Sequence, residues 1–126
     1  MRCHERAPRR ASVNVDEMRR HVEQLTTSLM DDEISIVLTK RLARVLRDPR
    51  SGEALEVHFP PIRSALSYAT ALHEIGHVKG RYQNSRNTMA RERWAWQWAR
   101  KHALIWTDAM ERSAIAALAW YTARGT

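Results

Sequence analysis

The chain has 126 residues, of which 44% are hydrophobic and 28% are charged, the composition of an ordinary globular protein. This length supports one domain with its own hydrophobic core, and the longest apolar run near the end, residues 114–121, is too short to span a membrane. The only cysteine, Cys3, cannot form a disulfide within the chain, so we expect a reducing compartment, the cytoplasm.

The net charge of +7 allows two interpretations. A basic chain can attract nucleic acid or acidic partners through its overall field. However, the basic residues are scattered, almost all are arginines, and no nucleic-acid-binding motif accompanies them, so a coding preference explains them as well. Residues 1–12 lack periodicity and no apolar segment follows them, which predicts a disordered basic tail, not a secretory signal, ahead of one domain over residues 13–126.

The first predicted element is a helix that begins at Val15. Its apolar residues repeat at intervals of three and four along one helical face: Val15, Met18, Val22, Leu25 and Leu29. Asn14 is the expected N-cap, and residues 31–32 end the helix.

Residues 33–48 fit either a strand or a helix. We favour a strand, because the sequence of residues 48–52 (Asp-Pro-Arg-Ser-Gly) is typical of a hairpin turn. After this turn, Leu55, Val57 and Phe59 alternate with polar residues, which predicts the partner strand.

Three further helices are predicted. The first covers about residues 62–78, opened by the prolines at 60–61 and ended by Gly80 as C-cap. After a polar loop at 81–87, the others cover about residues 88–104 and 109–122, and Asp108 with Glu111 forms a capping-box-like start to the last. The predicted class is α+β, a short antiparallel sheet of two or three strands packed on three or four helices.

Residues 73–77 read His-Glu-Ile-Gly-His. On a helix the two histidines lie one turn apart and differ by only about 40° in direction, so their rings converge on one point. Two neutral imidazoles are good zinc ligands, and Glu74 on the flank can take a proton from the attacking water. We predict a zinc site with His73 and His77 as ligands and Glu74 as the general base.

The surrounding helix supports this prediction. Between residues 64 and 78 the ionisable side chains besides Tyr68 are His73, Glu74 and His77, so the helix is expected to be buried on most sides. Buried charged groups need a partner or a metal. The alternative is a core histidine pair with a salt-bridged glutamate.

A catalytic zinc site needs a third protein ligand and an open position. The extended pattern His-Glu-x-x-His-x-x-Gly-x-x-His is nearly present with Gly80, but its last position is Gln83, and a carboxamide is a weak zinc ligand. We favour Glu92, because the small residues Ala95 and Ala99 share its helical face and would let the two helices approach closely. The alternative is an ordinary first-turn glutamate.

Two tryptophans of the same helix, Trp94 and Trp98, point away from the face of Glu92. We interpret them as core and helix-contact residues, not as a platform for a ligand.

Residues 72–77 (Leu-His-Glu-Ile-Gly-His) and 92–99 (Glu-Arg-Trp-Ala-Trp-Gln-Trp-Ala) resemble the gluzincin-type zinc metallopeptidases. They are most similar to the small phage and bacterial group related to the immunity-repressor and radiation-response peptidases. The resemblance covers about residues 55–103. It implies that His73, His77 and Glu92 hold Zn²⁺, that Glu74 is the catalytic base, and that the 54–59 hairpin binds substrate by edge addition. Many relatives have a second acidic residue where this chain has Trp94.

The sequence therefore predicts a zinc-dependent metallopeptidase acting on a protein or peptide, with no membrane partner. The donor that stabilises the oxyanion stays open among Tyr68, Tyr82, His102 and Tyr121. Two rival hypotheses are a basic nucleic-acid-binding protein with a structural zinc and an inactive metal-binding interaction domain.

Overall fold

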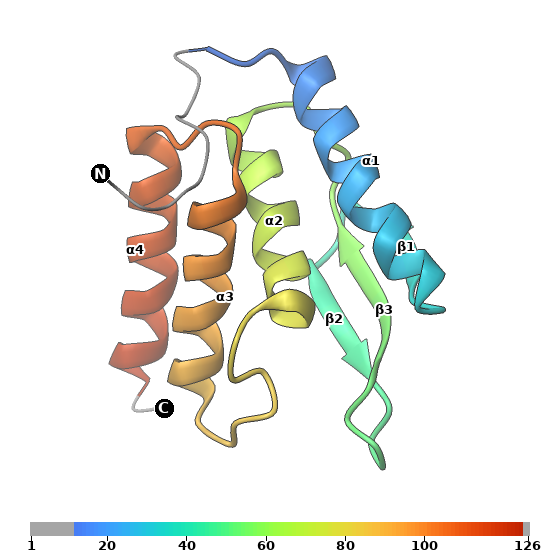
Figure 1. Ribbon diagram of the computed structural model, residues 1–126. Coiled ribbons are helices and arrows are strands. Elements are labelled where there is room, and N and C mark those ends of the chain that lie inside the picture. Colours follow the sequence, from blue (N-terminus) through green and yellow to red (C-terminus); the bar gives the residue numbers. More distant parts are fainter. Residues whose placement is uncertain (1–11, 125–126) are drawn as a thin grey trace, which may run out of the picture.

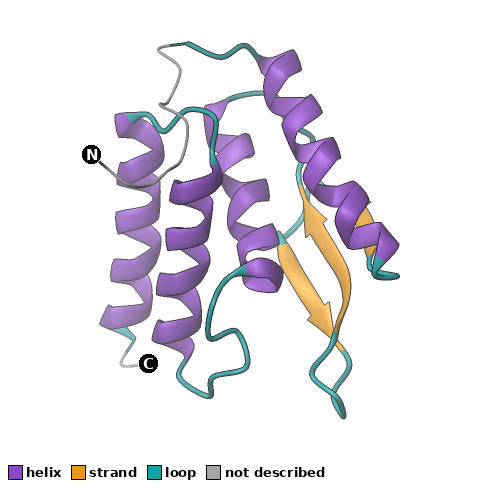
Figure 2. Cartoon of the chain, viewed as in Figure 1, coloured by secondary structure: helices purple, strands orange, loops and turns teal. Residues whose placement is uncertain are grey.

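The computed structural model describes residues 12–124, which form four helices and a three-stranded sheet (Figures 1 and 2). This confirms the predicted α+β class with a short sheet packed on helices. Apart from Ser12, the predicted basic tail lies outside the described residues. Within residues 12–124, no helix combines the length and the apolar character that a bilayer crossing requires.

Helix α1 (Val15–Asp31) begins and ends where the sequence predicts. The Asn14 side chain accepts a hydrogen bond from the backbone N–H of Glu17, and the Glu17 side chain accepts one from that of Asn14, which completes a capping box. The apolar face buries Met18, Val22 and Leu29.

The sheet has the strand order β1-β3-β2, so β3 (Ala54–Phe59) is its central strand. Strand β2 (Arg44–Arg47) pairs with β3 as the predicted antiparallel hairpin. Strand β1 (Ser35–Leu38) pairs with β3 in parallel, so residues 33–48 hold two strands and the sheet is mixed, not antiparallel as predicted. Alternating hydrophobicity cannot reveal this, because side chains alternate in the same way in both orientations.

Helix α2 (Ala65–Lys79) occupies the centre of the molecule, between α3 and the sheet, with α1 also against it (Figure 1). It starts three residues later than predicted, because Ser64 caps it together with Ser67 and the two prolines precede it. Gly80 is its C-cap, as predicted. Neighbours on several sides explain why this helix is apolar almost all round.

Helices α3 (Thr88–His102) and α4 (Asp108–Ala123) lie side by side beyond α2 (Figure 1). The N-cap of α4 is Thr107, which accepts a hydrogen bond from the N–H of Met110 at 3.1 Å, and not Asp108 as predicted. Glu111 is instead paired with Arg100 of α3 at 2.9 Å, which ties the two helices together.

Candidate metal centre

The site is built where α2 and α3 touch. A β-carbon added at Gly76 would lie 2.4 Å from the carbonyl oxygen of Ala95, so only glycine permits this approach of the two backbones. Ala95 and Ala99 are fully buried at the same contact, as their small size predicts. Glu92, three residues before Ala95, is thereby held against the helix that carries His73 and His77.

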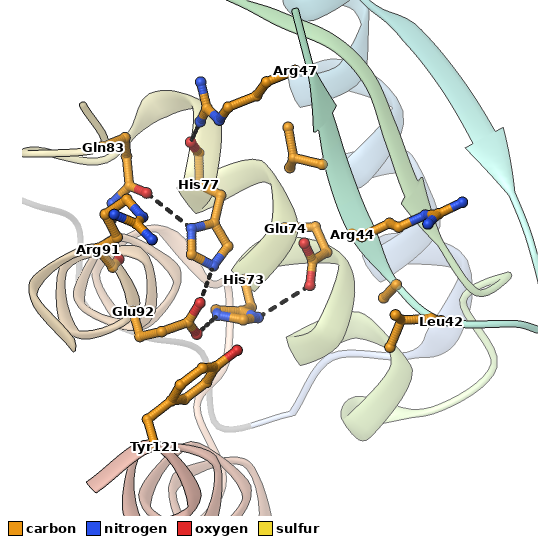
Figure 3. Close-up of a pocket in the computed structure, with 12 residues that line it drawn as sticks. Leu42, Arg44, Arg47, His73, Glu74, His77, Gln83, Arg91, Glu92 and Tyr121 are labelled. Atoms are coloured by element: carbon orange, nitrogen blue, oxygen red, sulfur yellow. Dashed lines mark hydrogen bonds and ion pairs between the residues drawn. The ribbon is translucent and has the colours of Figure 1, made fainter. Parts of the chain in front are cut away.

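The structure brings the three predicted ligands together. Nε2 of His73 lies 3.0 Å from Oε1 of Glu92, and Nε2 of His77 lies 2.9 Å from Oε2 (Figure 3). One ligand atom from each of the three residues lies within 4.8 Å of the others. Two ligands of a tetrahedral zinc ion are about 3.4 Å apart at ordinary bond lengths, so these residues fit a metal ion after small shifts.

Gln83 orients His77. Its Nε2 donates to the backbone carbonyls of Arg91 at 2.9 Å and Arg81 at 3.1 Å, which fixes the amide so that its oxygen faces the ring. Nδ1 of His77 donates to this oxygen at 2.8 Å (Figure 3). With Nδ1 held as a donor to Gln83, Nε2 is the ring nitrogen that would bind a metal ion, and Gln83 supports the site without being a ligand.

His73 is held by its two neighbours. Its ring stacks on Trp96 with centroids 4.1 Å apart and an interplanar angle of 11°. Its Nδ1 lies 3.3 Å from Oε2 of Glu74, on the side of the ring away from Glu92 (Figure 3). Both contacts fix the ring so that Nε2 points at Glu92.

His73 and Glu92 strongly shift each other's pKa. Burial lowers the pKa of His73, but hydrogen bonds and charges from Glu74 and Glu92 outweigh it and raise that pKa to about 9. Burial raises the pKa of Glu92, but the hydrogen bonds and charges of His73 and His77 lower it to about 2. The two carboxylates thus favour the protonated form of His73, and a metal ion bound there would have to displace that proton.

The cluster opens into a cleft of about 320 Å³. Its wall also includes Glu74, Tyr121 and three arginines, Arg44 and Arg47 of β2 and Arg91 of α3. Burial and the nearby charge of Arg91 both lower the pKa of Arg47, so the two guanidinium groups repel each other. Burial, and next the charges of Glu92 and Glu74, raise the pKa of Tyr121.

Among the four candidates for the oxyanion donor, Tyr121 is the one that lines this cleft, and its hydroxyl points towards Glu92 (Figure 3). Tyr68 is fully buried elsewhere, where it bonds to His21 at 2.6 Å and accepts from the N–H of Leu104. Tyr82 packs on Trp94, and His102 stacks on Trp98, both outside the cleft.

Trp94 and Trp98 differ in how they pack against the core, although the sequence predicts the same role for both. Trp98 packs partly against the core as expected, and the buried Trp96 belongs to the core. Trp94 is not in the core; it lies half-buried against Tyr82 and beneath the guanidinium of Arg81. The direction of a side chain on the helix could not distinguish Trp94 from Trp98, because the loop that covers Trp94 is placed by tertiary contacts.

The structure also changes which strand could bind substrate at its edge. Residues 54–59 are the central strand β3, whose two edges are already paired with β1 and β2. The strand beside the cleft is β2, at the end of the sheet, and Arg44, Val45 and Arg47 line the cleft.

Two imidazoles and a carboxylate converge on one point, a second carboxylate lies beside them, and an open cleft gives access. Such a group could bind a divalent metal ion and still leave a position free for another ligand. No family model matches this chain, and the comparisons found no match among curated proteins or solved structures.

Proposed function

We propose that this protein is a zinc-dependent metallopeptidase. The observation that carries the proposal is the meeting of His73, His77 and Glu92 at the wall of an open cleft, with Glu74 beside them. Two imidazoles and one carboxylate with a free position are the ligand set of catalytic zinc. The resemblance of the two helices to gluzincin-type peptidases supports the same assignment.

The chemistry is shared between the ion and Glu74. A zinc ion here would polarise a peptide carbonyl and lower the pKa of water towards about 7. Glu74 lines the cleft next to the ligands, so its carboxylate can take the proton of the attacking water and deliver it to the leaving amine. The Tyr121 hydroxyl, aimed into the same space, is the proposed donor to the developing oxyanion (Figure 3).

The substrate is proposed to be a protein or peptide bound in an extended form along β2. This strand ends the sheet, and its residues Arg44, Val45 and Arg47 line the cleft. An extended peptide can pair with the N–H and C=O groups of such an edge. Pairing at β2 would place the peptide backbone across the metal ligands.

The proposed compartment is the cytoplasm. One cysteine in 126 residues leaves no disulfide within the chain, which suits a reducing environment. A peptidase of this kind would then act on proteins inside the cell.

Glu74→Gln tests the mechanism. Removing the base should leave the ligands intact, so the variant should bind zinc like the wild type while cleavage of a fluorescent unfolded protein falls about 100-fold or more. Zinc content and initial rates are measured on the same preparations. Glu53→Gln, an exposed residue of the β2–β3 turn, makes the same change away from the cleft and should keep full activity.

Retained activity in Glu74→Gln would reject the mechanism. Stoichiometric zinc in a wild-type protein that cleaves no substrate would favour the inactive interaction domain instead.

A further inference from the structure

Among the cleft residues are two half-buried arginines that the proposed chemistry does not use. Arg47 and Arg91 line it together with the metal ligands. We propose that they form an anion subsite that binds a carboxylate of the substrate, close to the cleaved bond. The inference rests on the proposed peptidase function and names the class of substrate that the peptidase prefers.

Both guanidinium groups are held in place by neutral oxygen atoms. Arg47 donates to the carbonyl of Gly52 at 2.9 Å and to the carbonyl of His77. Arg91 donates to Thr88 Oγ1 at 3.0 Å and to the carbonyl of Ser85. Anchored and half-buried side chains lose little freedom when a ligand binds, so the pair is preorganised.

The charges of this pair are not balanced by carboxylates. Among residues 12–124, no ion pair joins Arg47 or Arg91 to an acidic side chain. The cleft's two acidic residues, Glu74 and Glu92, contact histidines instead. A carboxylate that enters between the two cations would relieve their repulsion and make charge-assisted hydrogen bonds.

The geometry restricts the subsite to one side of the metal ligands. Figure 3 shows Arg47 and Arg91 on the side of His77 and Gln83. The third arginine of the cleft wall, Arg44, points its guanidinium away from the histidines (Figure 3). A substrate carboxylate would therefore bind beside His77, within a few residues of the bond that is cut.

The experiment uses the zinc-loaded protein and a set of fluorogenic peptides with one uncharged parent sequence. The peptides come in pairs that differ at one position, where one member has glutamate and the other has glutamine, and this position is moved along the sequence. Each peptide is made once with a free C-terminus and once with an amidated one. We expect kcat/KM to be about 10-fold or more higher for the carboxylate member at one position. An internal position identifies an acidic side chain, and an effect of the free terminus identifies the terminal carboxylate.

In the variant Arg47→Gln/Arg91→Gln, the ratio of kcat/KM between the carboxylate peptide and its uncharged partner should be close to one. Arg50→Gln/Arg93→Gln removes the same charge from exposed residues outside the cleft and should preserve the ratio. If the double variant does not fold, Arg91→Gln alone should reduce the preference, and Arg47→Lys, which keeps the charge, should retain part of it.

Equal turnover of each peptide pair would overturn the inference, and so would a preference that survives the double variant. If the wild type cleaves no peptide, the proposed function fails separately, and calorimetric binding of the same pairs then decides. Tighter binding of the carboxylate member that disappears in Arg47→Gln/Arg91→Gln keeps the anion subsite, and equal binding rejects it.

Discussion

Two groups of cleft residues, the ligand side (His73, His77 and Glu92) and the arginine side (Arg47 and Arg91), handle charge in opposite ways. On the ligand side, His73 and His77 each meet an oxygen of the same carboxylate, Glu92. On the arginine side, Arg47 and Arg91 are held by carbonyl and hydroxyl oxygens and repel each other. Buried charges are tolerated when they are paired, so the first side is complete by itself or with a cation. The second side gains most from an anion that comes with a ligand.

The largest expected effect comes from breaking the ligand side. Glu92→Ala removes one of the three proposed ligands. Zinc affinity should fall by more than about 100-fold, because losing a residue that only supports a ligand already costs up to about 100-fold. Competition with a chromogenic chelator measures it. Arg91→Gln, one residue away on the same helix but not among the proposed ligands, should leave zinc affinity near that of the wild type. Equal losses in the two variants would mean that the two sides are not distinct.

A second prediction separates helix propensity from packing. Gly76→Ala would stabilise an isolated helix by about 0.5–1 kcal/mol. In the folded protein the new methyl group meets the Ala95 carbonyl, so we expect a net loss of about 1–3 kcal/mol in the free energy of unfolding, together with weaker zinc binding. Urea denaturation gives the sign. A stabilised protein with normal zinc affinity would contradict the close α2–α3 contact as the basis of the site.

A third prediction sharpens the role of Gln83 at the border between the two sides. Gln83→Leu removes the acceptor that orients His77, so zinc affinity should fall about 10- to 100-fold. Gln83→Glu keeps an acceptor and should lose less. Zinc affinity is again measured by chelator competition, and an unchanged value in Gln83→Leu would show that His77 is oriented without it.

The smallest expected effect is a pH dependence confined to the ligand side. The pKa of His73 is raised from 6.5 to about 9, so its contribution to stability is complete below pH 6.5 and is lost as the pH rises through about 9. The pKa of Glu92 is lowered from 4.5 to about 2, so its contribution is complete above pH 4.5 and is lost as the pH falls through about 2.

The zinc-free protein should therefore gain most stability from this cluster between pH 4.5 and 6.5. Denaturation of the chelator-treated protein from about pH 2 to about pH 9 measures the loss of stability on either side of this range, and Glu92→Ala should flatten the profile. A profile that Glu92→Ala leaves unchanged would assign the pH dependence to other groups. In calorimetry at pH 7, zinc should also displace about one proton, because His73 must lose its own to bind the ion.

Many local features of this protein can be predicted from patterns of residues that lie close together in the sequence. The cap Asn14 and the hairpin turn mark element ends through local backbone chemistry, and the structure has them where the sequence predicts them. His73 and His77 share a face because one helical turn separates them, whatever surrounds the helix. These features depend on residues a few positions apart, which is the range that a sequence pattern can report.

What only the tertiary structure decided involves contacts between distant segments. Gly76 matters because Ala95 of another helix lies against it, and Gln83 matters because its amide reaches the ring of His77. The parallel direction of β1 and the presence of Arg47 and Arg91 in one cleft likewise depend on how elements pack. Spacing along the chain constrains rotation within one helix or strand, but it does not constrain the distance between two elements, and that distance makes the site.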